Sequence, residues 1–125
     1  MAQTSVPIVY VEVDFDGTSI NNYPFFVTPN EGNFYPADLV FTLQEVSGLI
    51  SPPSVSVGTN PDNYNNIVSS TTLTGLVSPE ETYRVVLNTV VTSIPVNTQL
   101  YVRVGVAAVA TTFKFRAHFS GHHYS

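Results

Sequence analysis

The sequence predicts an all-β protein, an antiparallel two-sheet β-sandwich of jelly-roll type with about seven or eight strands. Nine prolines and seven glycines interrupt the chain every few residues, so no long helix is expected. Between these interruptions apolar and polar residues alternate, which is typical of strands with one buried face. Without crossover helices the strands must pair antiparallel, and a second sheet is needed to cover the apolar faces.

The first half of the chain predicts strands at 9–15, 25–27, 39–46 and 54–58. An Asp-Gly turn at 16–17 ends the first strand, a loop spans 21–24, and a polar loop follows at 59–66. The side chains expected to face the core from these strands are Val9, Val11, Val13, Phe15, Leu39, Phe41, Leu43, Val55 and Val57.

The second half predicts a brief strand at 67–68, a turn with Leu73, Leu76 and Val77 packed inward, and one helical turn at 78–81. Three clearer strands follow at 83–91, 100–106 and 112–119. The connection at 107–111 is short enough to join the last two as a hairpin. The inward side chains of these strands are expected to be Tyr83, Val85, Leu87, Thr89, Val91, Leu100, Val102, Val104, Val106, Phe113, Phe115, Ala117 and Phe119.

Length and composition indicate one domain, 1–125, with short terminal arms at 1–7 and 120–125. A chain of this size needs no disulfide, and it contains no cysteine. The polar first residues and the absence of a long apolar run predict a protein made in a cytoplasm and not inserted in a membrane.

Charged residues are scarce, 10% of the chain against about 25% in typical soluble domains. Either another protein covers part of the surface, or Ser, Thr and Asn replace the charges; the sequence leaves both explanations open. A net charge of −5 with only four basic residues disfavours nucleic acid as a partner.

Signals for catalysis or metal binding are weak. His118, His122 and His123 cluster before Tyr124, but adjacent histidines at a chain end do not supply the fixed third and fourth ligands of a metal site. Residues 14–18 resemble the start of a calcium loop, yet Phe25 stands where its final carboxylate belongs. No nucleophile motif or phosphate-binding loop is present. We therefore expect a non-enzymatic protein without a cofactor or metal.

Charges of opposite sign alternate on the outer faces of the first and last predicted strands. Glu12 and Asp14 lie on the first strand, and Lys114, Arg116 and His118 on the last. We expect the two strands to be neighbours, within one subunit or between subunits, although each could simply be a solvated face. Outward tyrosines could add a contact surface. The full set of interface candidates is Glu12, Asp14, Lys114, Arg116, His118, Tyr101, Arg103, His122, His123 and Tyr124.

Five segments resemble small jelly-roll structural proteins of tailed bacteriophages, the capsid cement or decoration type: 53–60 (PSVSVGTN), 64–68 (YNNIV), 72–74 (TLT), 100–104 (LYVRV) and 113–117 (FKFRA). The resemblance covers about the last two-thirds of the chain. It implies a virion protein made in the host cytoplasm, no cofactor, a homo-oligomer with a trimer favoured, and the major capsid protein or another virion protein as partner.

Two other functions remain open. A tail or fibre module that binds a host-surface glycan would use the exposed tyrosines and the asparagine-rich loop at 59–66. A small metalloenzyme would use the C-terminal histidines.

Overall fold

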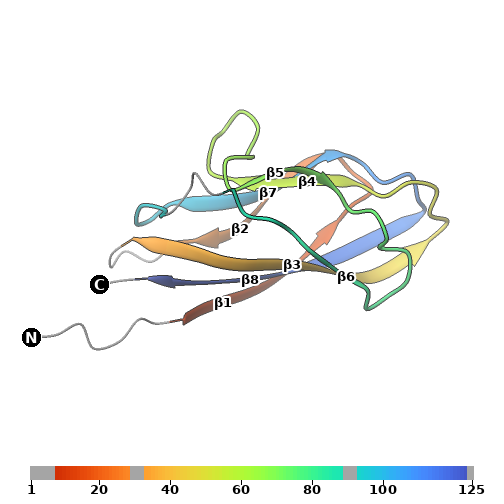
Figure 1. Ribbon diagram of the computed structural model, residues 1–125. Coiled ribbons are helices and arrows are strands. Elements are labelled where there is room, and N and C mark those ends of the chain that lie inside the picture. The colour runs from red at the N-terminus through yellow and green to blue at the C-terminus, as the bar shows by residue number, and fades with distance from the viewer. Residues whose placement is uncertain (1–7, 29–32, 89–92, 124–125) are drawn as a thin grey trace, which may run out of the picture.

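Figure 1 shows the computed structural model, which describes residues 8–28, 33–88 and 93–123. The described part of the chain forms two four-stranded sheets and contains no helix. The strands are β1 (Ile8–Asp16), β2 (Asn21–Val27), β3 (Phe34–Ser47), β4 (Ser54–Gly58), β5 (Val68–Thr72), β6 (Thr82–Arg84), β7 (Gln99–Val106) and β8 (Thr112–His123).

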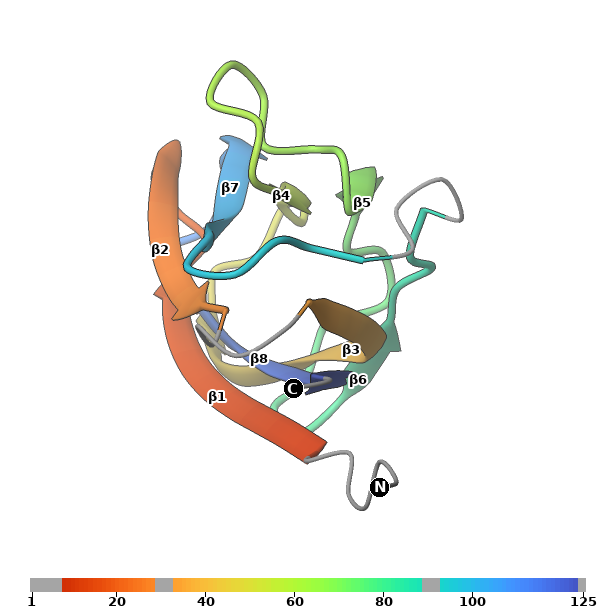
Figure 2. The ribbon, with the colours of Figure 1, turned by 90° about the vertical axis from the view of Figure 1, so that its left-hand side faces the viewer.

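The strand order identifies a jelly roll. One sheet has the order β1-β8-β3-β6 and the other β2-β7-β4-β5, with every pair antiparallel. The pairs β1–β8, β2–β7, β3–β6 and β4–β5 are nested, as in one long hairpin that has been rolled up so that β8 also meets β3 and β7 also meets β4. Figure 2 shows the two sheets facing each other across the core. The predicted fold class is confirmed.

The predicted hairpin between the last two strands is wrong. β7 and β8 belong to opposite sheets, and the connection between them crosses the end of the sandwich. There it bonds to two other turns, through Ala108 N–H to Gly17 O (2.7 Å) and Val109 N–H to Ser51 O (2.9 Å). A short connection can join two strands of one sheet as a hairpin or cross from one sheet to the other. Here it crosses, because β8 pairs with β1 and β7 pairs with β2 in the opposite sheet.

The last strand is longer than predicted. β8 continues through His123 and pairs with β1 and β3 along this extension, so Ser120–His123 is sheet and not a terminal arm. Gly121 continues the inward-facing row of β8 and lies against the ring of Phe34. The polar sequence Ser-Gly-His-His hid this continuation, because glycine carries no apolar side chain to mark the inward face.

The core is rich in phenylalanine. Seven of the eight phenylalanines are buried, and Phe26 packs against them. Phe119 contacts three other rings, with centroid distances of 5.5 to 5.8 Å to Phe25, Phe26 and Phe34. The inward residues predicted for β3, β4 and β8 are all buried, as are Phe15, Leu100, Val102 and Val104. The alternation in the sequence therefore located most of the core.

Other predicted details need correction. β2 includes residues 21–24, predicted as a loop, and β6 ends at Arg84 although Val85 remains buried. Val77 is exposed in the connection between β5 and β6, and Val106 is exposed although it is the last residue of β7 and pairs with Ser54. The predicted inward side chains of Val9, Val11, Thr89 and Val91 lie outside the described part of the structure.

The predicted helical turn at 78–81 is a reverse turn in which Glu80 adopts a positive φ of 74°. The turn is closed by Glu81 N–H to Ser78 O (3.2 Å), and it is bonded to β3 through Glu80 N–H to Leu43 O (2.7 Å) and Leu43 N–H to Glu81 O (2.9 Å). The Glu81 carboxylate accepts bonds from the N–H groups of Val77 and Ser78 (2.8 and 2.6 Å).

Candidate interaction surfaces

Strands β1 and β8 are neighbours within one chain and bring the predicted charges together. Their register places Glu12 opposite His118, Asp14 opposite Arg116 and Asp16 opposite Lys114. The Gly17 N–H donates to Phe113 O, so the hydrogen-bonded pairs involve the odd-numbered residues of β1. The even-numbered pairs are therefore the non-hydrogen-bonded ones, in which side chains approach most closely.

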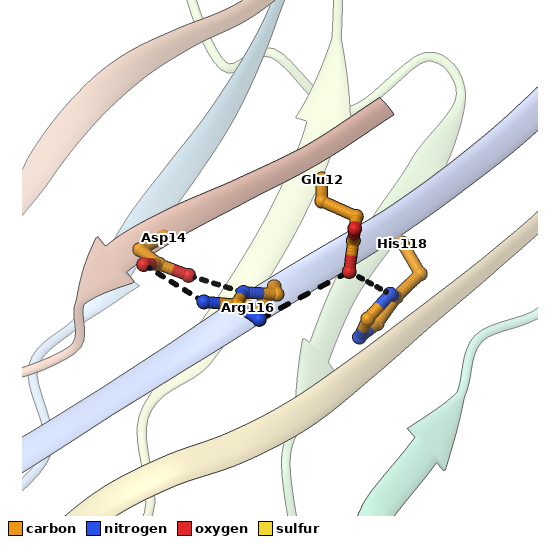
Figure 3. Close-up of polar contacts among 4 residues, drawn as sticks. All are labelled: Glu12, Asp14, Arg116 and His118. Atoms are coloured by element: carbon orange, nitrogen blue, oxygen red, sulfur yellow. Dashed lines mark hydrogen bonds and ion pairs between the residues drawn. The ribbon is translucent and has the colours of Figure 1, made fainter. Parts of the chain in front are cut away.

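The side chains form a connected network (Figure 3). Arg116 donates from Nε to Asp14 Oδ1 (2.6 Å) and from Nη2 to Asp14 Oδ2 (3.3 Å), a two-pronged contact. Its Nη1 lies 4.0 Å from Glu12 Oε2, which also lies 3.1 Å from His118 Nδ1. Hydrogen bonding by Arg116 lowers the pKa of Asp14, and the positive charge of Arg116 adds to this effect.

All four basic residues of the chain contact polar partners within it. Besides Arg116, Lys114 Nζ lies 3.9 Å from Glu45 Oε2, and Arg84 forms an ion pair with Asp38. Arg103, on the opposite sheet, donates to Asn22 Oδ1 (3.1 Å). Because these charges are largely matched inside the molecule, they do not form the basic patch that a nucleic acid would need.

An open hollow of about 460 Å³ lies beside the charged network. It contains three carboxylates and one lysine, so its formal charge is negative. Hydrogen bonds from the Thr18 hydroxyl and N–H (2.6 and 2.9 Å) lower the pKa of Asp16, as Arg116 does for Asp14. A general acid needs a raised pKa, so neither aspartate is arranged for that role. The lining residues are Asp14, Phe15, Asp16, Gln44, Glu45 and Lys114.

Side chains of the asparagine-rich loop at 59–66 form hydrogen bonds within the loop itself. Asn60 Oδ1 accepts from the N–H groups of Asn65 and Asn66 (2.8 and 3.2 Å), and the Asn66 side chain bonds to Thr59 at both its oxygen and its nitrogen. The Tyr64 ring stacks on Tyr101 with centroids 4.4 Å apart. These groups are the ones that a glycan site in this loop would need, and here they already bind one another.

The C-terminal histidines do not form a metal site in the described part of the chain. His118 faces Glu12, whereas His122 lies four residues further along β8, opposite Ile8 and Tyr35. No group of three His, Cys, Asp or Glu side chains suited to a metal ion occurs among the described residues. The side chain of His123 and the whole of Tyr124 lie outside them.

The interface candidates thus do not form one surface. Glu12, Asp14 and Arg116 share an outer face with Lys114 and His118, while Tyr101 and Arg103 lie on β7 in the other sheet. Their role in binding another protein stays a prediction.

Sequence reasoning missed an apolar end of the sandwich, opposite the termini (Figure 1). The connections β1–β2, β3–β4 and β7–β8 meet there. Four apolar side chains in these connections or at the adjoining strand ends are exposed: Ile20 (64%), Ile50 (82%), Val106 (57%) and Val109 (51%). Ile50 precedes the Ser-Pro-Pro break, a position from which exposure could have been inferred. Exposed apolar side chains gathered in this way are typical of protein contacts.

No helix in the described residues is long and apolar enough to cross a membrane. The sequence matches no protein-family model and no curated protein.

Solved structures of three phage capsids contain chains with the same fold. A chain of the acid-stable capsid of Helicobacter pylori bacteriophage KHP30 superposes with a TM-score of 0.67 at 14% identity, over 94% of this chain and 89% of that one. A chain of the Ralstonia phage GP4 capsid gives 0.62 at 12% identity, over 99% and 88%. A chain of the cyanophage Pam1 capsid gives 0.59 at 17% identity, over 94% and 84%. The predicted resemblance is thus confirmed at the level of the fold: this chain has the jelly-roll architecture of chains in these phage capsids.

Proposed function

We propose that the protein is a structural component of a phage virion, and specifically a capsid cement or decoration protein that stabilises the head through protein–protein contacts. The observation that carries the proposal is the correspondence of fold over nearly the whole length of both chains with chains of three phage capsids. The match covers 94–99% of this chain and 84–89% of the others, which favours a similar place in the particle over a shared module inside a larger protein.

The surface chemistry favours the outside of the shell. A protein that lines the packaged genome would need clustered bases, but the four basic residues of this chain contact acidic or amide side chains of the same molecule. The exposed apolar end, by contrast, suits a contact with protein. These features support a non-catalytic, contact-forming role, and we expect a homo-oligomer, with a trimer favoured.

The test is the native mass of the purified chain, followed by sedimentation with capsid shells that lack it. A trimer of the 13.6 kDa chain has a mass of about 41 kDa, three times that of the monomer. Co-sedimentation at saturating stoichiometry, together with shells that resist heating better, is the expected result. A monomer that does not bind shells would contradict the proposal, and binding to a glycan array would then favour the tail or fibre alternative.

A further inference from the structure

Among the residues that the structure describes, no strand pairs with the outer edge of β1. This strand lies at the border of its sheet, as Figure 2 shows looking along the strands, and pairs with β8 over nine residues without a register shift. The other three edges are interrupted or short. β2 contains Pro24 and a register shift, β5 has five residues, and β6 has three. Proteins usually protect such edges with proline, lysine or bulges, and β1 contains none of these.

The free backbone groups of this edge can be assigned. The odd-numbered residues of β1 bond to β8, as the Gly17 N–H to Phe113 O bond indicates. The N–H and C=O groups of residues 8, 10, 12 and 14 therefore point away from β8, where an added strand would bond to them. The carbonyl oxygen of Asp16, at the end of the strand, already accepts a hydrogen bond from the Tyr23 hydroxyl (3.1 Å).

Charge specifies the kind of strand that fits. Glu12, Asp14 and Asp16 alternate along the outer face of β1, which has no basic residue. The acidic hollow, with three carboxylates around Lys114, adjoins the Asp16 end of the strand. A lysine or arginine on an incoming strand would meet Asp16 across the new ladder, and would share Glu12 and Asp14 with His118 and Arg116, which already contact them.

The same charges disfavour a second copy of this chain. Pairing of two β1 strands would bring together two strips with three carboxylates each. The basic residues of the chain offer no better donor, because Lys114, Arg116 and Arg103 belong to the central strands β8 and β7, and β6, which holds Arg84, has only three residues.

We propose that the free edge of β1 binds an extended segment of another protein, one that carries Lys or Arg at alternate positions, as an added fifth strand of the sheet. The inference goes beyond the proposed function and does not depend on it, because the edge would accept such a segment from any protein.

The probe is a blocked peptide, acetyl-Thr-Val-Lys-Val-Lys-Val-Thr-amide, titrated into ¹⁵N-labelled protein. We expect the amides of residues 10, 12 and 14 to exchange rapidly with solvent in the free protein and to become protected when the peptide binds. A peptide with glutamate in place of both lysines should not bind. Protection confined to other residues, or no binding of the lysine peptide at millimolar concentration, would overturn the proposal.

Two variants separate backbone from charge. Tyr10→Pro removes one outward N–H while leaving the ladder to β8 intact, and should weaken peptide binding about fivefold. Asp16→Asn keeps the acceptor for Thr18 but removes a charge from the hollow, and should weaken binding about two- to fivefold. Asp62→Asn is the matched control, since it removes the same charge from the distant loop and should leave the affinity unchanged. Equal weakening by Asp16→Asn and Asp62→Asn would show that only net charge matters and would contradict the proposed site.

The self-pairing alternative has its own signature. If the amides of residues 10, 12 and 14 are already protected without peptide, and the protection decreases on dilution together with the sedimentation coefficient, then a second copy occupies the edge. That result would also overturn the proposal.

Discussion

Replacement of Gly121 by alanine tests the extension of β8 past Phe119. A Cβ at this position would lie 2.9 Å from Phe34 Cε2, clash further with the end of the same ring, and crowd the Tyr35 carbonyl oxygen. Phe34 is fully buried and touches Phe26 and Phe119, so its ring has little room to move. Overpacking of this kind costs about 1–3 kcal/mol. We expect Gly121→Ala to lower the free energy of unfolding by that amount.

The size of the effect distinguishes sheet from arm. If residue 121 belonged to a solvated arm with no fixed conformation, alanine would affect the folded and unfolded states alike and leave the free energy of unfolding nearly unchanged. Gly105→Ala is a matched control in β7, because the nearest atom to its added Cβ is Arg103 Nε at 3.6 Å. Urea unfolding followed by near-ultraviolet circular dichroism measures both variants. Gly121→Ala as stable as the parent, or more stable, would refute the reasoning, and unchanged stability of Gly105→Ala would exclude a general intolerance of alanine.

Three further predictions concern the charged network and the loop at 59–66. A double-mutant cycle of Asp14→Ala and Arg116→Ala should give a coupling free energy of about 0.5–1 kcal/mol in urea unfolding. The two-pronged contact strengthens the coupling, and the partial exposure of both side chains limits it. A coupling free energy near zero would contradict this geometry. The pKa values of Asp14 and Asp16 in the folded protein lie below the ordinary 3.8, so in acid the unfolded chain binds more protons than the folded one. The two carboxylates therefore stabilise the fold above about pH 4, and this stabilisation is lost as the pH falls through and below that value. Thermal melts between pH 3 and 6 should show a shallower loss for Asp14→Asn than for the parent, and identical slopes would contradict the assignment. Gly58→Ala would place a Cβ 2.6 Å from the Tyr64 carbonyl carbon and should cost about 1–3 kcal/mol with loss of the loop's amide protection, measured by hydrogen exchange.

Sequence periodicity located the core well where apolar side chains mark both ends of a strand. Leu39, Phe41 and Leu43 were predicted inward and are buried, and the same holds for Phe113 and Phe115. Burial follows directly from side-chain alternation, so it can be read from one strand at a time.

Strand ends and strand partners are less visible in the sequence. Gly121 faces inward but has no side chain to show it, and Val106 continues the alternation of β7 yet is exposed at the last position of the strand. The separation of β7 and β8 into different sheets depends on β1 and β2, more than 70 residues earlier. The alternation within one strand does not indicate which strand it pairs with. The opposite charges on β1 and β8 did indicate their pairing, because side chains that face each other on neighbouring strands often carry opposite charges.

The charged network also bears on where this protein can meet a partner. A basic residue that is held by an acidic neighbour gives little extra attraction to a second protein, because the new contact must replace an existing one. Arg116 is held in this way by Asp14, and Arg84 by Asp38. Among the described residues, the groups that gain most from a new contact are therefore those with no existing contact to replace: the outward backbone groups of β1 before Asp16 and the exposed apolar side chains of Ile50 and Val109. Charge substitutions in the network should accordingly change stability more than binding, whereas changes at the β1 edge and the apolar end should do the reverse.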